Sequence, residues 1–151
     1  MKYSKQNLAS KTGKKGFTLV ELLVAMAIIG VLAAMAVGSF RTAQLRGRDT
    51  QRKSDLKQVS NALELYYADY GRYPDSLTWG GEFTDGRTIY FKVLPTDPSG
   101  GVYTYTLVGA STQKYQLFAR LENTEDQDCI QDNCAQNPNF AVTSANTTAT
   151  E

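Results

Sequence analysis

The chain of 151 residues contains no histidine. This absence removes the side chain that most often acts as a general base or binds a metal, and it excludes the Ser-His and Cys-His pairs of nucleophilic enzymes. The only cysteines are Cys129 and Cys134, which lie close together near the C-terminal end. The alternative of a membrane-anchored hydrolase has no support, because the sequence offers no nucleophile with an activating partner. We therefore expect no catalytic residues and no enzyme activity.

Proline is absent from residues 17–70, since all four prolines come later in the chain. Nothing therefore interrupts a helix over these residues, and Gly71 is a natural C-terminal stop. The second half has apolar residues at alternating spacings of three and four, typical of an amphipathic helix: Leu56, Val59, Leu63, Tyr66 and Tyr70. We expect one helix of about 54 residues. Two helices with a break within residues 41–50 remain the alternative.

Charge is missing from Leu22 through Phe40, a run of 19 residues. As a helix this run spans roughly 28 Å, close to the ~30 Å hydrocarbon thickness of a bilayer. It is too long for a cleaved secretory signal. If the run were only a membrane anchor, Glu21 would have no role. Its carboxylate would still raise the free energy of insertion into lipid by a few kcal/mol. Glu21 therefore needs a partner other than lipid.

The net charge of +1 hides a strong segregation. Residues 1–16 contain five lysines and no acid, and residues 41–57 contain six bases against two acids. From residue 72 onward there are ten acids and five bases. Such a division indicates parts in different surroundings, and the N-terminal lysines predict a cytoplasmic N-terminus.

After Gly71 the sequence becomes rich in turn residues, and we expect a globular head over residues 71–135. The stretches 102–108 ("VYTYTLV") and 114–121 ("KYQLFARL") alternate and predict an antiparallel hairpin covered by the Leu63, Tyr66 and Tyr70 face of the helix. Residues 88–95 ("TIYFKVLP") fit a strand or a short turn. Residues 136–151 are rich in Thr, Asn and Ala, and we expect a flexible C-terminal tail there.

The stretch "KKGFTLVELLVAMAIIGVLAAMA" resembles the class III leader and N-terminal helix of the type IV pilin family, which includes the pseudopilins of type II secretion. The resemblance covers residues 14–37. It implies that a prepilin peptidase cuts between Gly16 and Phe17 and methylates the new Phe17 amine. It also makes Glu21 the assembly residue. In a low-dielectric bundle, the Glu21 carboxylate can pair with the Phe17 amine of a neighbouring subunit.

The stretch "LPTDPSGGVYTY", residues 94–105, resembles the head of major pseudopilins and small related pilins. Locally, Asp97-Pro98 starts a turn, and Gly100-Gly101 lets the chain swing into the next strand. Calcium holds the C-terminal loop in major pseudopilins, and this chain has acids there that suit calcium: Glu125, Asp126, Asp128 and Asp132. Because the family's glycine-rich loop is missing, we favour a solvated acidic loop and commit to no cofactor.

The cysteine pair resembles the C-terminal disulfide loop of many pilins. Outside the cytoplasm Cys129 and Cys134 are expected to form a disulfide that closes a small loop.

The bases of residues 41–57 invite a nucleic-acid interpretation. Ion pairs with the acidic heads of neighbouring subunits are favoured instead, so no direct contact with nucleic acid is expected.

The expected fold is α+β, with a long N-terminal helix packed on a small antiparallel sheet, as in pilins. Residues 1–16 are a cytoplasmic leader that is cleaved, 17–40 the transmembrane and filament-core helix, and 41–70 its amphipathic continuation. The expected function is a pilin that polymerises into a type IV pilus-like filament. The alternatives are a major pseudopilin of type II secretion and, more remotely, a DNA-uptake pilin.

The expected partners are other copies of the chain, the prepilin peptidase, an inner-membrane assembly platform and minor pilins. Before assembly the subunit is expected to cross the membrane once, with its head outside the cytoplasm. Afterwards it belongs to an extracellular or periplasmic filament.

Overall fold

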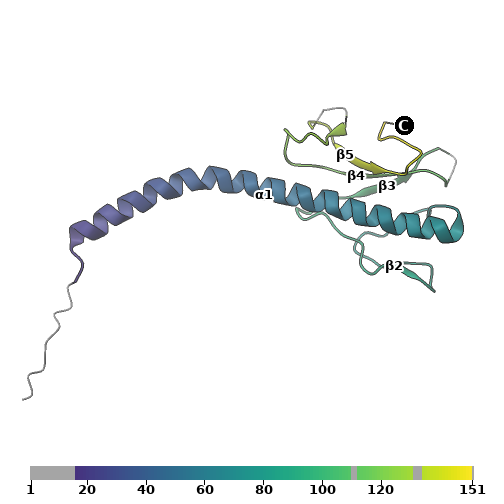
Figure 1. The fold of residues 1–151 in the computed structure, drawn as a ribbon, viewed down its shortest axis with the longest axis horizontal. Helices are drawn as coiled ribbons and strands as arrows, with labels where there is room; N and C mark the ends of the chain where they lie inside the picture. Colours follow the sequence, from purple (N-terminus) through teal and green to yellow (C-terminus); the bar gives the residue numbers. More distant parts are fainter. Residues whose placement is uncertain (1–15, 110–111, 131–133, 151) are drawn as a thin grey trace, which may run out of the picture. The chain divides into compact units, whose positions relative to one another are not determined.

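The structure is a computed structural model that describes residues 16–109, 112–130 and 134–150. Its elements are the helix α1 (Leu19–Tyr70) and the strands β1 (Phe83–Thr84), β2 (Ile89–Phe91), β3 (Thr104–Leu107), β4 (Tyr115–Ala119) and β5 (Phe140–Thr143). The expected α+β class is confirmed (Figure 1). The chain divides into two compact units between Phe40 and Arg41. Most of the expected leader, residues 1–15, lies outside the described residues.

Helix α1 runs without interruption for 52 residues, so the single-helix prediction is confirmed and the break within residues 41–50 is wrong. The helix ends where the sequence indicates. Gly71 has a φ of 65°, a conformation that glycine adopts without strain, and its N–H donates to the Tyr67 carbonyl at 2.7 Å.

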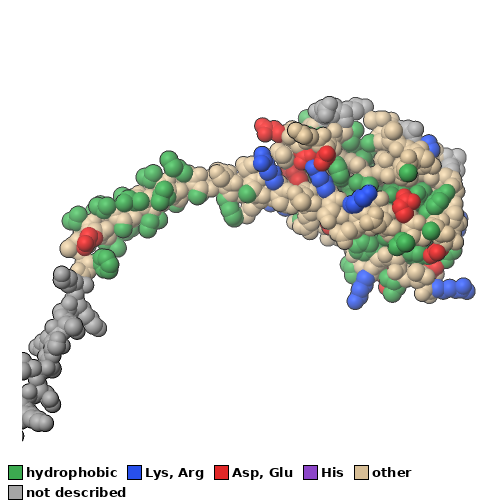
Figure 2. Space-filling view, viewed as in Figure 1, with side chains coloured by type: hydrophobic (Ala, Val, Ile, Leu, Met, Phe, Trp, Pro, Cys, Tyr) green, Lys and Arg blue, Asp and Glu red, His purple; other side chains and the backbone are tan. Residues whose placement is uncertain are grey.

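In the first unit, every described side chain from Phe17 to Phe40 is exposed. Helix α1 contains a stretch long and apolar enough to cross a membrane. Hydrophobic side chains cover the visible face of this unit (Figure 2). A helix that is hydrophobic all round requires an apolar environment, either lipid or other helices.

In the second unit, β3, β4 and β5 form an antiparallel sheet with β4 in the centre. The β3–β4 hairpin pairs Thr104 with Phe118 and Leu107 with Tyr115, which confirms the predicted hairpin. Within residues 88–95 the strand alternative is correct, because β2 pairs antiparallel with β1. In Figure 1 the three-stranded sheet lies along one side of the second half of α1, and β2 lies on the other.

The expected flexible tail is wrong for residues 140–143, which form β5 on the second edge of β4. Phe140 is 9% exposed and belongs to the core. Asn139 is fully buried, and its side chain donates to the Leu121 carbonyl at 3.0 Å and accepts from the Leu121 N–H at 2.6 Å. The Thr- and Asn-rich composition concealed this strand because its polar groups are satisfied by the chain itself.

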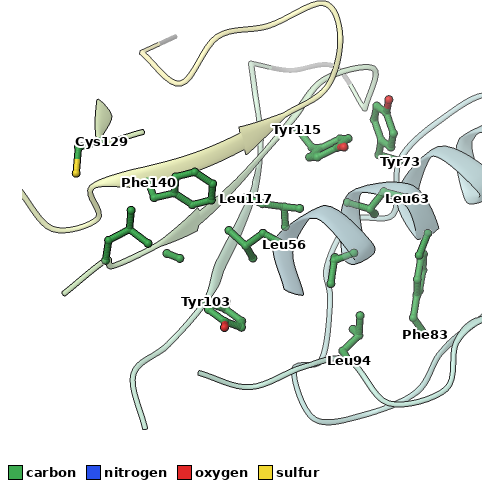
Figure 3. Close-up of a cluster of buried hydrophobic side chains, with 14 residues drawn as sticks. Leu56, Leu63, Tyr73, Phe83, Leu94, Tyr103, Tyr115, Leu117, Cys129 and Phe140 are labelled. Atoms are coloured by element: carbon green, nitrogen blue, oxygen red, sulfur yellow. The ribbon is translucent and has the colours of Figure 1, made fainter. Parts of the chain in front are cut away.

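The core of the second unit packs the helix against β4 (Figure 3). Leu56, Val59 and Leu63 of α1 are fully buried with Tyr115 and Leu117 of β4. The Tyr115 hydroxyl and Ser60 Oγ share a hydrogen bond of 2.9 Å. This apolar contact is what attaches the sheet to the helix.

The expectation that the Leu63, Tyr66 and Tyr70 face covers the β3–β4 hairpin is confirmed for Leu63, whereas Tyr66 and Tyr70 have further partners beside the hairpin. Tyr66 stacks on Phe83 and Tyr90 of the small β1–β2 sheet, with ring centroids 5.4 and 5.2 Å apart. Tyr70 stacks on Tyr66 at 4.7 Å and hydrogen-bonds to Asp85. The apolar residues of the helix therefore pack against both sheets: Leu63 contacts β4, and Tyr66 contacts Phe83 of β1 and Tyr90 of β2.

Candidate processing and assembly site

Thr18 and Glu21 form a reciprocal pair of hydrogen bonds at the start of α1. The Thr18 N–H and hydroxyl both donate to Glu21 Oε2 at 2.8 Å, and the Glu21 N–H donates to Thr18 Oγ1 at 3.2 Å. This geometry is a capping box, with Thr18 as the N-cap and Glu21 three residues later. The Glu21 carboxylate is therefore held by its own chain, and it also lies where a negative charge complements the helix dipole.

Gly16 and Phe17 lie in non-helical backbone just before this cap. Phe17 is 92% exposed, and a Cβ added at Gly16 would meet no atom within 4 Å. The peptide bond between them is thus accessible, and the requirement for a glycine does not come from crowding within this chain. The roles of Gly16, Phe17 and Glu21 stay predictions at this point.

The sequence reasoning missed the role of Thr18, which it treated only as part of a motif. The signal was present, because Thr-x-x-Glu directly before an apolar run is the ordinary sequence pattern of a capping box. The capping side chain and the carboxylate are one unit, and any new partner of Glu21 has to compete with Thr18 for it.

A second polar cluster lies buried in the head around Arg52, whose side chain is 1% exposed. Its guanidinium donates to both carboxylate oxygens of Asp97, at 2.7 and 3.0 Å, and to Asp49 at 2.7 Å. Glu122 completes the cluster at 2.7 Å. Bidentate pairing of this kind satisfies a buried charge that would otherwise be very costly.

The cluster ties the helix to two separate loops. Asp97 accepts the Ser99 N–H at 2.8 Å, and the Gly100 N–H donates to the Asp97 carbonyl at 3.1 Å, which confirms the predicted turn. Asp49 accepts the N–H groups of Glu122 and Asn123 at 2.9 and 2.8 Å. No sequence spacing indicates these contacts.

The ion pairs shift the pKa values of the acids. Arg52 holds the pKa of Asp97 well below its usual range, because its hydrogen bonds outweigh the opposite effect of burial. A bond from Arg48, opposed by burial and reinforced by Arg52, lowers the pKa of Glu122 to about 2. Both acids are therefore ionised at neutral pH.

The prediction that the bases of residues 41–57 pair with neighbouring subunits is wrong for three of them. Arg48 pairs with Glu122 at 2.5 Å, and Arg52 pairs as described above. Lys53 pairs with Asp126 and Asp128, both at 2.6 Å. Apart from Asp49, which lies three residues before Arg52, these partners are 45 to 75 residues away in the same chain, a separation that no local sequence pattern spans.

Lys53 lies where the calcium hypothesis placed a cation. Its ammonium reaches both Asp126 and Asp128 and lies 5.8 Å from the centre of the Phe140 ring. Burial alone would raise the pKa of Asp126, but the Lys53 hydrogen bond lowers it overall. Glu125 is exposed, and Asp132 lies outside the described residues. Among the residues that the structure does describe, no cluster of three or more acidic, histidine or cysteine side chains could hold a metal.

Cys129 and Cys134 form the predicted disulfide, with Cα atoms 5.2 Å apart. The Cys134 carbonyl accepts a hydrogen bond from the buried Asn139 side chain at 3.0 Å. Cys129 is 5% exposed and belongs to the core. The disulfide therefore joins the acidic loop to the segment that leads into β5.

Comparison with known families gives two matches along the chain. Residues 11–37 match the prokaryotic N-terminal methylation motif. Residues 41–130 match type II secretion system protein G. Together they cover the capped helix start, the amphipathic half of α1 and most of the head.

Individual relatives agree with both matches. The chain is 30% identical over 119 residues to a type IV major pilin of Neisseria gonorrhoeae, covering 74% of this chain and 72% of that protein. It is 32% identical over 108 residues to the type II secretion system core protein G of Pseudomonas aeruginosa, covering 64% and 75%. The core protein G of Escherichia coli is 31% identical over 101 residues, covering 60% and 70%. No solved structure gives a significant match.

Proposed function

Because the chain belongs to the family of type IV pilins and type II secretion protein G, we propose that it is a subunit of a pilus-like filament. A prepilin peptidase cuts between Gly16 and Phe17 and methylates the Phe17 amine. The uncovered apolar helix of residues 17–40 is then held in lipid until it packs among the helices of other copies.

The observation that carries this proposal is the capped carboxylate at the start of an entirely exposed apolar segment. Glu21 lies one helical turn from the amine that cleavage would create at Phe17. In lipid the Thr18 hydrogen bonds satisfy the acid. In the filament the Phe17 amine of a neighbouring subunit replaces or joins them, and a charged pair in a low dielectric fixes the register between helices.

The intact mass of the mature protein tests the processing step. We expect the loss of residues 1–16 and the gain of one methyl group on Phe17. Substitution of Gly16 should block cleavage without disturbing the fold, because a side chain at Gly16 meets no other atom. An uncut N-terminus in the wild-type protein would contradict the proposal.

Glu21→Ala separates processing from assembly. The variant should lose its leader and gain its methyl group, yet form no filaments, since the pairing partner of the amine is gone. Phe17→Leu, which keeps both the amine and the carboxylate, is the matched control and should still assemble. Normal filaments from Glu21→Ala would remove Glu21 from the mechanism.

A pseudopilin of type II secretion is the second candidate function. The match of residues 41–130 to protein G favours it, whereas the type IV major pilin of Neisseria gonorrhoeae aligns with more of this chain than the Pseudomonas protein G does, 74% against 64%. Electron microscopy of surface filaments, compared with secretion after deletion of the gene, distinguishes the two. A DNA-uptake role remains the remote third alternative. In each case the partners include an inner-membrane assembly platform and minor subunits, and the role is structural rather than catalytic.

We further propose that Lys53, rather than calcium, supplies the cation of the acidic loop. A chelator should leave the unfolding midpoint of the wild-type protein unchanged. Lys53→Met should lower the midpoint, since Asp126 and Asp128 then repel each other, and added calcium should restore part of the loss. A wild-type midpoint that falls on chelation would contradict this assignment.

A further inference from the structure

A small pocket of about 230 Å³ lies beside the β1–β2 sheet. The residues that line it include the aromatic Tyr66 and Phe83 and the acidic Glu82 and Asp85, and no lysine or arginine is among the described residues that line it. The volume is below that of pockets for drug-sized ligands and suits a single long side chain. Carboxylates next to aromatic rings favour a cation, and a guanidinium in particular.

The two acids of the pocket differ in what they already bind. Asp85 accepts the N–H groups of Arg87 and Thr88 at 2.7 and 2.6 Å, and the hydroxyls of Tyr70 and Tyr90 also contact it. The Glu82 side chain is exposed, and within residues 16–109, 112–130 and 134–150 no hydrogen bond or ion pair engages its carboxylate. Glu82 is therefore available to a partner.

Arg120 has the complementary property. It follows β4, its side chain is exposed, and no carboxylate of the described part of the chain pairs with it. It lines a groove of about 920 Å³. The other charged residues of that groove, Arg52, Asp97 and Glu122, pair with one another.

Arg120 also has an apolar neighbour in the same groove, because Val102 is 79% exposed there. An unpaired guanidinium next to an exposed aliphatic side chain is typical of an interface that another molecule covers. The groove of Arg120 and the pocket of Glu82 share no lining residue, so they are different surfaces of the head.

We propose that the pocket of Tyr66, Glu82, Phe83 and Asp85 on one subunit receives Arg120 of a second copy of this chain. The contact joins two different surfaces, so each subunit can give one arginine and receive another. A contact of this heterologous kind extends into a helical filament unless the rotation closes a ring. The inference rests on the proposed filament function and assigns a head-to-head contact within it.

Exchange of the two charges tests the contact in cells that express the full chain. Glu82→Arg and Arg120→Glu should each reduce sheared filaments by about tenfold or more, because like charges in an interface cost several kcal/mol. The double variant should restore filaments to near the wild-type amount. Glu125→Arg and Arg72→Glu, which change exposed charges outside both surfaces, are the matched controls and should leave the filament amount unchanged.

A double variant that stays as defective as either single variant would overturn the contact, as would rescue of Glu82→Arg by Arg72→Glu. Total subunit in the membrane, measured for every variant, excludes loss by misfolding. Wild-type cells without any filaments would instead contradict the proposed function itself.

Cysteine substitution gives a second, independent readout. Glu82→Cys combined with Arg120→Cys, treated with a short thiol crosslinker, should produce a ladder of multimers. Each single variant should remain monomeric. Dimers from Glu82→Cys alone would show that like surfaces meet, and that result would overturn the heterologous contact.

Discussion

Thr18 is the residue that gives Glu21 a partner before any neighbour is present. Its N–H and hydroxyl hold the carboxylate, and its own oxygen accepts the Glu21 N–H. The Thr18 side chain therefore determines how readily the Glu21 carboxylate exchanges its hydrogen-bond partner for one from a neighbouring subunit. A weaker cap frees the carboxylate, and it also loosens the first turn of the helix.

Thr18→Val removes the cap while keeping the shape of the side chain. We expect the first turn of α1 to lose about 1 kcal/mol, so that the Glu21 amide proton exchanges about fivefold faster in detergent micelles. Hydrogen exchange followed by NMR or mass spectrometry measures this change. Thr18→Ser should keep the wild-type rate. Equal exchange in the valine and wild-type proteins would show that the hydroxyl does not cap the helix.

Among single residues, the sequence was enough to predict the roles or partners of some side chains but not of others. Glu21 was predicted to be functional because a carboxylate in an apolar run raises the free energy of membrane insertion. Cys129 and Cys134 were predicted to pair because the head was expected to lie outside the cytoplasm and the pair resembles the C-terminal disulfide loop of many pilins. For Arg52, only the pairing with Asp49 has a helical (i, i+3) spacing that the sequence shows. Its partners Asp97 and Glu122 come from distant parts of the chain, and no spacing relates them to it.

Among the elements, α1 was predictable almost to its ends because local rules decide it. An apolar run, a capping residue and a terminal glycine all act within a few residues. The β3–β4 hairpin was predictable for the same reason, as its strands are adjacent in sequence. Strand β5 was missed because its place depends on pairing with β4, which is more than 20 residues away.

A chain that ends after Ala135 tests the importance of β5. Without Phe140 and Asn139, one edge of β4 is unpaired and the core is exposed, so we expect the head to lose its cooperative unfolding transition. The fluorescence of Trp79, the only tryptophan, reports the transition. A chain that ends after Ala149 keeps β5 and should unfold like the wild type. A cooperative transition at the wild-type midpoint in the shorter chain would show that β5 is dispensable.

The stability of the head as a whole should depend on pH through its buried acids. The pKa of Glu122 is lowered from 4.5 to about 2, and that of Asp97 lies well below 3.8. Lowered values in the folded state mean stability that is complete above the ordinary pKa and is lost on acidification. We expect a loss on the order of 2 kcal/mol between about pH 4.5 and pH 2.

Glu122→Gln should reduce this slope. The variant should be less stable than the wild type at pH 7, and the difference should shrink towards pH 2, where the wild-type acid is protonated as well. Urea unfolding of the full chain in detergent, followed by Trp79 fluorescence, measures both proteins. If the free energy of unfolding changed with pH equally in both proteins, groups other than Glu122 would be responsible for the pH dependence.

The ion pairs of Arg48, Arg52 and Lys53 also determine when the head can form. Except for Asp49, which precedes Arg52 on the helix, their partners are synthesised 45 to 75 residues later, and Phe140 of the core comes later still. Contacts between such distant residues form late in folding. In the proposed topology, the apolar helix has therefore already entered the membrane while the head is still unfolded. Until these later segments are made, Arg48 and Lys53 lack their acidic partners and Arg52 has only Asp49, so the newly made subunit passes through a brief period in which it needs protection from other molecules.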